Sequence, residues 1–217
     1  MAALVADGTL VAIATTYGSA KNMTAVTNAN PAVATLESSH GIIVGDIMEM
    51  SSGWPDLDDK ILRCSVLSTN DVTLEGFTTA NTTKFPAGTG TGTIREITAW
   101  TNIAQIIGIA VEGGGPQYTV YQFLNELTQR RIPLAKEPLN VTLTLADDIT
   151  LAQQATIRTA QDGGVPVAMR MTLPNGSKIY LNGYWSISDL PNLALGQVNS
   201  RTVGFALTAL PTEYSTL

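Results

Sequence analysis

Short runs of β-branched and apolar residues, separated by turn residues, are the feature that most restricts the fold of this chain. The runs TLVAIATT (9–16), VATLES (33–38), GDIMEMSS (45–52), KILRCSVLS (60–68) and DVTLEGF (71–77) have the composition of β-strands. The segments SHG, SSGWPDLDD and STND between them contain turn-forming residues. Strands this short and this closely spaced predict antiparallel β-structure.

The second half of the chain continues this pattern. PLNVTLTLA (138–146) places Leu139, Val141, Leu143 and Leu145 on one face, which predicts a strand. VPVAMRMTL and KIYLNGYWSIS flank a turn centred on Asn175-Gly176 and predict a hairpin. GTIREITAW (92–100) and SRTVGFALTAL (200–210) are further predicted strands, and the latter is expected to close the chain.

One segment predicts a helix, ADDITLAQQATIRTAQDGG (146–164). Asp148 or Thr150 can cap its N-terminus, and Gly163-Gly164 end it. We expect its faces to be set by Leu151, Ala155 and the pair Arg158/Thr159.

The segment YTVYQFLNEL (118–127) has apolar residues at helical spacing, but it is short and is followed by prolines. We expect a long loop there, with at most a helical turn.

Acidic residues are concentrated in the middle of the chain. The sequence has 217 residues, 18 acidic and 12 basic, for a formal charge of −6. Residues 23–94 contain eight acidic and three basic residues, and the remainder contains ten and nine. We therefore predict a small β-domain at 23–94 inserted into a nearly neutral host domain, 1–22 and 95–217. The host is expected to be an antiparallel β-sandwich or open barrel with one flanking helix.

The composition excludes several classes of function. An acidic chain whose only adjacent basic pair is Arg130-Arg131 is poorly suited to binding nucleic-acid phosphates.

The N-terminal segment MAALVADGTLVAIATTYG lacks the basic start of a signal peptide, and Asp7 interrupts its apolar run. No stretch approaches the roughly 20 apolar residues of a membrane span. We expect a soluble intracellular product.

The candidate reactive residues favour structural roles. His40, the one histidine, has no second ligand nearby, and Gly41 and Gly45 around it suggest a tight turn that ends at Asp46. WPDLDDK (54–60) lacks the ligand spacing of a calcium loop and is expected to be a solvated turn. Cys64 is expected to be a small core residue. We predict no catalytic, metal or cofactor site, and no enzyme.

Two stretches resemble known proteins. MRMTLPNGSKIYLNGYWSISDLPNLALGQVNSRTVGFALTAL, together with PLNVTLTLADD and DGTLVAIATTYG, resembles the major tail tube proteins of lambda-like, long and non-contractile-tailed phages. The resemblance rests on the order of elements, with Pro174-Asn175-Gly176, Gly183-Tyr184-Trp185 and Arg201-Thr202-Val203 as the matching steps.

The second stretch, VTNANPAVATLESSHGIIVGDIMEM followed by SSGWPDLDDKILRCSVLSTNDVTLEGF, is similar to a small β-module of phage structural proteins. That module is itself similar to the β-barrel half-domain of ubiquitin-activating enzymes. The module is not the adenylating part of those enzymes, so the resemblance implies a β-barrel and no chemistry.

The first resemblance implies a virion structural protein that assembles in the host cytoplasm. Such subunits form homo-hexameric rings that stack into a tube, with the genome passing through the lumen without specific binding. Tail-tip initiator, tape-measure and tail terminator proteins are the implied partners. Segment 112–137 corresponds to a loop that reaches the adjacent ring, so Arg130, Arg131 and Lys136 are candidate inter-ring contacts.

The chain departs from this family in the position of its extra domain. Lambda-like subunits carry any extra domain at the C-terminus, whereas here it follows the first strand. We expect it to project outward, because a domain of this size per subunit would not fit inside a lumen as wide as DNA. Two alternatives remain: the tube protein of a contractile injection system, and a receptor- or carbohydrate-binding tail-tip or decoration protein.

Overall fold

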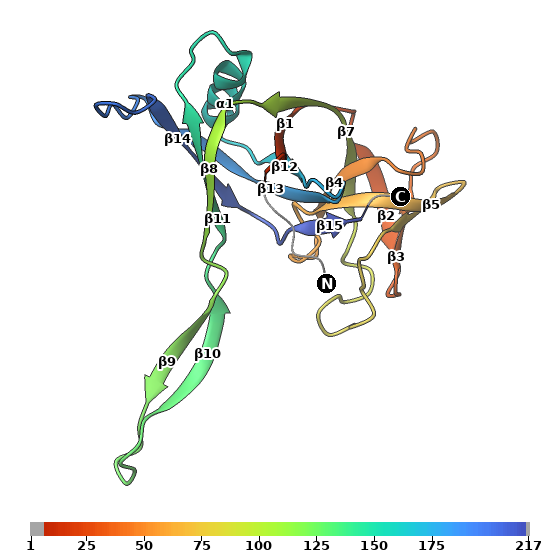
Figure 1. Ribbon diagram of the computed structural model, residues 1–217. Helices are drawn as coiled ribbons and strands as arrows, with labels where there is room; N and C mark the ends of the chain where they lie inside the picture. Colours follow the sequence, from red (N-terminus) through yellow and green to blue (C-terminus); the bar gives the residue numbers. More distant parts are fainter. Residues whose placement is uncertain (1–6, 216–217) are drawn as a thin grey trace.

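A computed structural model describes residues 7–215, and this part is antiparallel β-structure with one helix, as the sequence predicts. Residues 1–6, which belong to the predicted host domain and begin the segment weighed above as a signal peptide, lie outside the described residues. The long strand β7 (Gly92–Ile103) belongs to two β-structures at once. Its first half closes a barrel, and its second half begins a curved open sheet (Figure 1).

The barrel consists of β7 and five other strands. They lie in the order β2-β3-β6-β5-β4-β7, and the start of β7 pairs back onto β2, so the sheet closes on itself. The bounds are β2 (Lys21–Val26), β3 (Ala32–Leu36), β4 (Ile47–Ser52), β5 (Ile61–Ser68) and β6 (Asp71–Leu74). Strand β2, which begins with Lys-Asn, is not predicted from the sequence, whereas the other four are.

A single large side chain anchors the barrel interior. Trp54 is buried, and its indole N–H donates hydrogen bonds to the carbonyl oxygen of Pro86 at 3.0 Å and to Oγ1 of Thr89 at 2.9 Å. Gly90 leaves room for the indole, because a Cβ there would lie 2.7 Å from the ring. The rest of the core is formed by alternating inward residues, among them Met23, Ala34, Leu36, Met48, Met50, Leu62, Cys64, Val72, Leu74 and Ile94.

The open sheet runs in the order β7-β1-β12-β13-β14-β11-β8. Its strands are β1 (Leu10–Tyr17), β8 (Ile106–Glu112), β11 (Asn140–Ala146), β12 (Val167–Thr172), β13 (Lys178–Ile187) and β14 (Ser200–Leu207). The alternation predicted for β11 is confirmed, since Val141, Leu143 and Leu145 are all buried in the sheet's own core. The predicted hairpin is confirmed as β12 and β13, joined at Gly176 with φ 84°.

Helix α1 (Ala152–Gly163) packs on this core and differs in detail from the prediction. Its N-cap is Leu151, which makes no capping side-chain bond, while Asp148 instead accepts hydrogen bonds from Thr150 in the preceding turn. The buried face is formed by Gln153, Gln154 and Ile157, so the predicted faces are wrong. The two glutamines can be buried because their side-chain amides are hydrogen-bonded at the margin of the sheet. Gln153 exchanges hydrogen bonds with the backbone of Ala104, and Gln154 donates one to Asp147. The predicted stop is confirmed, with Gly164 in the left-handed region.

The C-terminal strand corrects a further expectation. The segment 200–210 does not close the chain as a strand, because β15 (Thr212–Tyr214) follows and pairs with the start of β13. The Tyr214 hydroxyl accepts a hydrogen bond from the Arg63 N–H at 3.0 Å and donates one to the Glu75 carbonyl at 3.2 Å. Strand β15 therefore attaches the barrel to the open sheet.

A mixed polar and apolar joint holds the two parts together. Arg95 on β7 makes a two-point ion pair with Glu49 at 2.9 Å and lies 4.1 Å from the Tyr17 ring centroid. The buried Asn182 amide donates to Glu49 at 3.2 Å and to the Asp59 carbonyl at 3.0 Å. Burial raises the pKa of Tyr17 to about 12, so this phenol stays neutral. An apolar cluster completes the joint: Ala14, Ile61, Ile97, Ala168, Tyr180 and Tyr214.

Candidate assembly surfaces

The free edge of the open sheet is apolar. Strand β8 pairs with β11 on one side, and no described strand pairs with its other side. Ile109 lies opposite Leu143 and Val111 lies opposite Val141, so both extend the row of core side chains. Leu143 and Val141 are buried, but Ile109 is 40% exposed and Val111 is 63% exposed. The hydrophobic core therefore continues to a strand edge that nothing covers, which is the arrangement expected of an association surface.

A long hairpin extends from the same edge. Strands β9 (Pro116–Tyr121) and β10 (Arg130–Lys136) form a separate two-stranded sheet that projects far from the body (Figure 1). The prediction of a loop with a helical turn is wrong here. A two-stranded ribbon tolerates Pro133, because each of its strands has one side without a partner strand and the pairing is irregular between Pro133 and Lys136. The tip carries three exposed apolar side chains, Phe123, Leu124 and Leu127.

The predicted contact residues all lie on strand β10. Arg130 forms an ion pair with Glu126 at the tip, at 2.5 Å. Arg131 and Lys136 are exposed and form no ion pair with any residue in the described range. The structure therefore places the three cations along one strand of the hairpin, where the charges of Arg131 and Lys136 are not paired with a carboxylate of the described residues.

A second apolar surface lies at the opposite end of the sheet strands. The hairpin follows the end of β8, whereas the loop at 188–199 joins the end of β13 to the start of β14. Arg201 fixes the base of this loop, bonding Asp147 at 2.5 Å and the carbonyl oxygens of Ser188 and Asp189. In the family resemblance this segment is only the loop between two strands. Its exposed apolar residues are Leu190, Leu193, Leu195 and Val198.

On strands β8, β11 and β14 and the second half of β13, the sheet face turned away from α1 is lined by small and polar residues. The strand register gives three rows across β8, β11, β14 and β13. Only one residue of these rows, Glu112, is charged. The rows are Glu112, Asn140, Ala206 and Tyr184; Ala110, Thr142, Gly204 and Ser186; and Gly108, Thr144 and Thr202.

The candidate reactive residues form turn hydrogen bonds or lie in the core. The predicted turn at His40 is present: Nδ1 accepts the Ile42 N–H at 3.0 Å, Nε2 lies 3.1 Å from the Thr69 carbonyl, and Gly41 and Gly45 have positive φ. Cys64 is buried in the barrel core, where burial raises the pKa of its thiol. Asp58 accepts the Ser52 N–H at 2.9 Å.

Residues 7–215 contain no group of three or more His, Cys, Asp and Glu side chains placed to hold a metal ion. No helix in this range is long and apolar enough to cross a membrane.

Comparison with known proteins assigns the chain to a class. The sequence matches the family described as phage tail tube protein, TTP, over residues 52–216, about three quarters of its length. A comparison with curated proteins gave no match. The chain belongs to the phage tail tube protein family, so its role is structural and its place is the virion tail. The matched region includes the whole hairpin, α1 and β15, together with part of the barrel.

Proposed function

We propose that the chain is the subunit of hexameric rings that stack into the tail tube and conduct the phage genome into the host, as in the lambda-like phages. The observation that carries this proposal is the uncovered β8 edge, where Ile109 and Val111 continue the core to the surface. A neighbouring subunit that adds its sheet at this edge would bury both side chains and satisfy the free backbone groups. Repeated around a ring, the same contact closes the sheets into one inner barrel.

The small-residue face is the surface we assign to the lumen. It lies on the side of the sheet opposite α1, and across its three rows it presents hydroxyls, amides and glycines with Glu112 as the single charge. These rows contain no lysine or arginine, so this part of the face would not retain DNA by phosphate contacts. Passage of the genome without specific binding is therefore consistent with this face.

Ring stacking is assigned to the hairpin and the loop at 188–199. These two apolar surfaces lie at opposite ends of the sheet strands, so a head-to-tail stack brings the tip of one subunit toward the loop of another. Arg130, Arg131 and Lys136 would meet carboxylates across this boundary. At the loop end, Asp189 is exposed and lies 3.3 Å from Arg158, and Asp148 is half-buried.

We further propose that residues 23–94 are an inserted β-barrel domain on the outside of the tube, and that 1–22 and 95–217 form the tube domain. The closed strand order of the barrel and its separate core support this division. A closed barrel offers no free edge to the ring, which fits an external position. The tail-tip initiator, tape-measure and terminator proteins are the proposed partners, and the host cytoplasm is the proposed place of assembly.

The edge contact is tested with a matched pair of variants. Val111→Lys puts a charge on the β8 edge, and Val66→Lys puts one on the barrel surface, where Val66 is 57% exposed. Both should fold with unchanged melting temperature, because both side chains are already largely in water. Negative-stain electron microscopy of the concentrated subunit should show rings or tubes for the wild type and V66K, and their loss for V111K. Normal tubes from V111K would contradict the assignment of the edge.

A further inference from the structure

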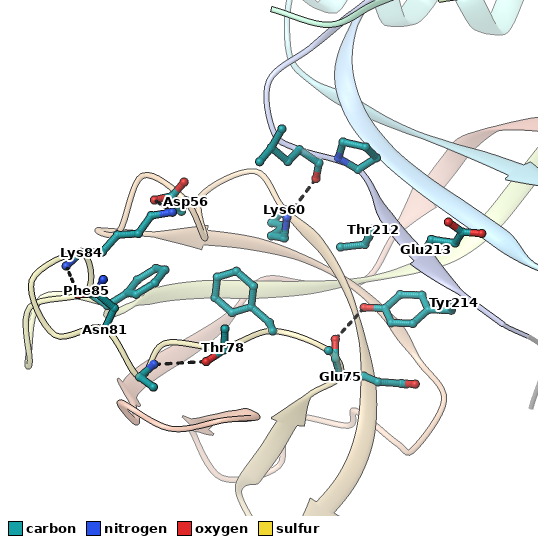
Figure 2. Close-up of a pocket in the computed structure, with 15 residues that line it drawn as sticks. Asp56, Lys60, Glu75, Thr78, Asn81, Lys84, Phe85, Thr212, Glu213 and Tyr214 are labelled. Carbon is teal, nitrogen blue, oxygen red and sulfur yellow. Dashed lines mark hydrogen bonds and ion pairs between the residues drawn. The ribbon is translucent and has the colours of Figure 1, made fainter. Parts of the chain in front are cut away.

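A pocket of about 610 Å³ lies where the barrel meets the C-terminal segment (Figure 2). One wall is formed by barrel loops that contain Asp56, Lys60 and the aromatic residues Phe77 and Phe85, and the other by residues 210–214. This volume is within the range of small-molecule sites in proteins. No residue of β8 or of the hairpin lines this pocket, so the contacts proposed for assembly do not include it.

The charged groups of this pocket are unevenly paired. Glu75 is bound at two points by Arg63, at 2.5 and 2.6 Å. Asp56 pairs with Lys84 at 2.9 Å. Lys60 forms no ion pair with any residue of the described chain, although only 9% of it is exposed. Glu213 also lines the pocket, and Figure 2 shows it on β15, on the other side from Lys84.

The ammonium of Lys60 therefore has unused bonding capacity. Its one hydrogen bond goes to the Leu210 carbonyl oxygen at 3.1 Å, and the Phe77 ring centroid lies 5.7 Å away. An ammonium has three N–H donors, so two remain for a ligand. Burial lowers the pKa of Lys60, because it disfavours the charged ammonium, and the nearby Asp56 offsets this only in part. An anion that enters the pocket would stabilise the charged ammonium.

We propose that this pocket binds a small ligand that presents a carboxylate or phosphoryl group on a polar carbon skeleton, such as a uronic acid or a polyol phosphate. The anionic group would accept hydrogen bonds from Lys60, with Lys84 at the rim as a second cation. The skeleton would lie against Phe77, Leu210 and Pro211, with Asn81 available for its hydroxyl groups. Such a ligand could be a free small molecule or the repeat unit of an anionic cell-surface polymer.

Titration calorimetry of the purified full-length chain tests this proposal with glucuronate, glycerol 1-phosphate and glucose as probes. We expect saturable binding of at least one anionic probe and none of glucose. Lys60→Met should weaken that binding at least tenfold, because it keeps the aliphatic stem and removes the charge. Lys21→Met, outside the pocket, is the matched control and should bind like the wild type. Absence of saturable binding by both anions, or equal binding by K60M, would overturn the proposal.

A melting experiment separates lost binding from lost folding. K60M removes a buried cation that has no counter-ion, so its melting temperature should equal or exceed that of the wild type. Lys84→Gln supplies a second, milder variant, with binding weakened by less than K60M.

A short oligomer of the bound anion distinguishes the two sources of the ligand. If the chain binds a polyuronate or polyglycerol phosphate oligomer more than tenfold more tightly than the monomer, the ligand is a surface polymer. Equal affinity for oligomer and monomer indicates a free small molecule. The tube assembly of K60M should be normal, so failure of this proposal leaves the proposed assembly intact.

Discussion

The barrel and the open sheet are built from strands of similar length and composition, and they share β7, yet they end differently. In the barrel, β7 pairs back onto β2, so each strand has a neighbour on both sides and the apolar side chains point inward. In the sheet, the order ends at β8, where Ile109 and Val111 stay exposed in line with buried core residues. The difference teaches that strand closure, rather than strand sequence, decides which part of the chain leaves apolar side chains exposed at a free edge.

The largest expected effects come from emptying the two cores separately. Trp54→Ala in the barrel and Phe205→Ala in the sheet should each reduce the free energy of unfolding by about 3–5 kcal/mol. Cys64, the one cysteine of the chain, lies in the barrel core and reports its opening to a thiol reagent. We expect W54A to accelerate Cys64 labelling in native buffer far more than F205A. Equal acceleration by both variants would mean that the barrel and the sheet open as one unit.

A smaller, pH-dependent effect is expected at the base of the loop at 188–199. The hydrogen bond from Arg201 holds the pKa of Asp147 below its ordinary value. The carboxylate therefore contributes stability above its unfolded pKa of about 3.9, and this contribution is lost as the pH falls through the lower folded value. Asp147→Asn should lower the melting temperature at pH 7, and the difference from wild type should shrink as the pH falls below about 4. A difference that is constant between pH 7 and 3 would exclude the ion pair as its cause.

The smallest effect on the folded subunit is expected on the hairpin. Reversing both Arg130 and Arg131 to Glu removes one exposed ion pair with Glu126, and such pairs contribute less than about 1 kcal/mol. The melting temperature should therefore hardly change, while tube length and yield, measured by electron microscopy, should fall. Lys178→Glu, on a strand outside the hairpin, serves as the control. Unchanged tube length and yield in the double variant would remove these arginines from the inter-ring contact.

Most strands of both parts can be predicted, because apolar and polar residues alternate along a strand that has one buried face and one exposed face. Val141, Leu143 and Leu145 are a direct example. Helix α1 is predicted by its length and its glycine stop, but its buried face is not, because Gln153 and Gln154 are buried through hydrogen bonds that depend on partners distant in sequence. Strand β15 has only three residues, too few for any periodic signal.

The assembly surfaces are harder to predict, since exposure depends on which strand ends the sheet. The apolar run that contains Ile109 does not by itself show whether its strand is central or at an edge, and only the strand order shows that β8 is the edge. The hairpin is not predicted from the sequence, because Val120, Tyr121 and Leu124 have helical spacing and Pro133 argues against a strand. In a two-stranded ribbon without a core, neither periodicity nor a proline has its usual meaning. Arg130, Arg131 and Lys136 were selected from the resemblance, and their inter-ring role stays a prediction.

Strand β7 also has a mechanical consequence. It runs through both β-structures without a break, and Gly18 keeps the ladder beside it continuous with a hydrogen bond to the Glu96 carbonyl oxygen at 2.8 Å. Bending the barrel against the sheet would require hydrogen bonds on both sides of β7 to break together, along with the Arg95–Glu49 pair. A force applied to the barrel is therefore transmitted to the sheet along β7, and the barrel and the sheet move together.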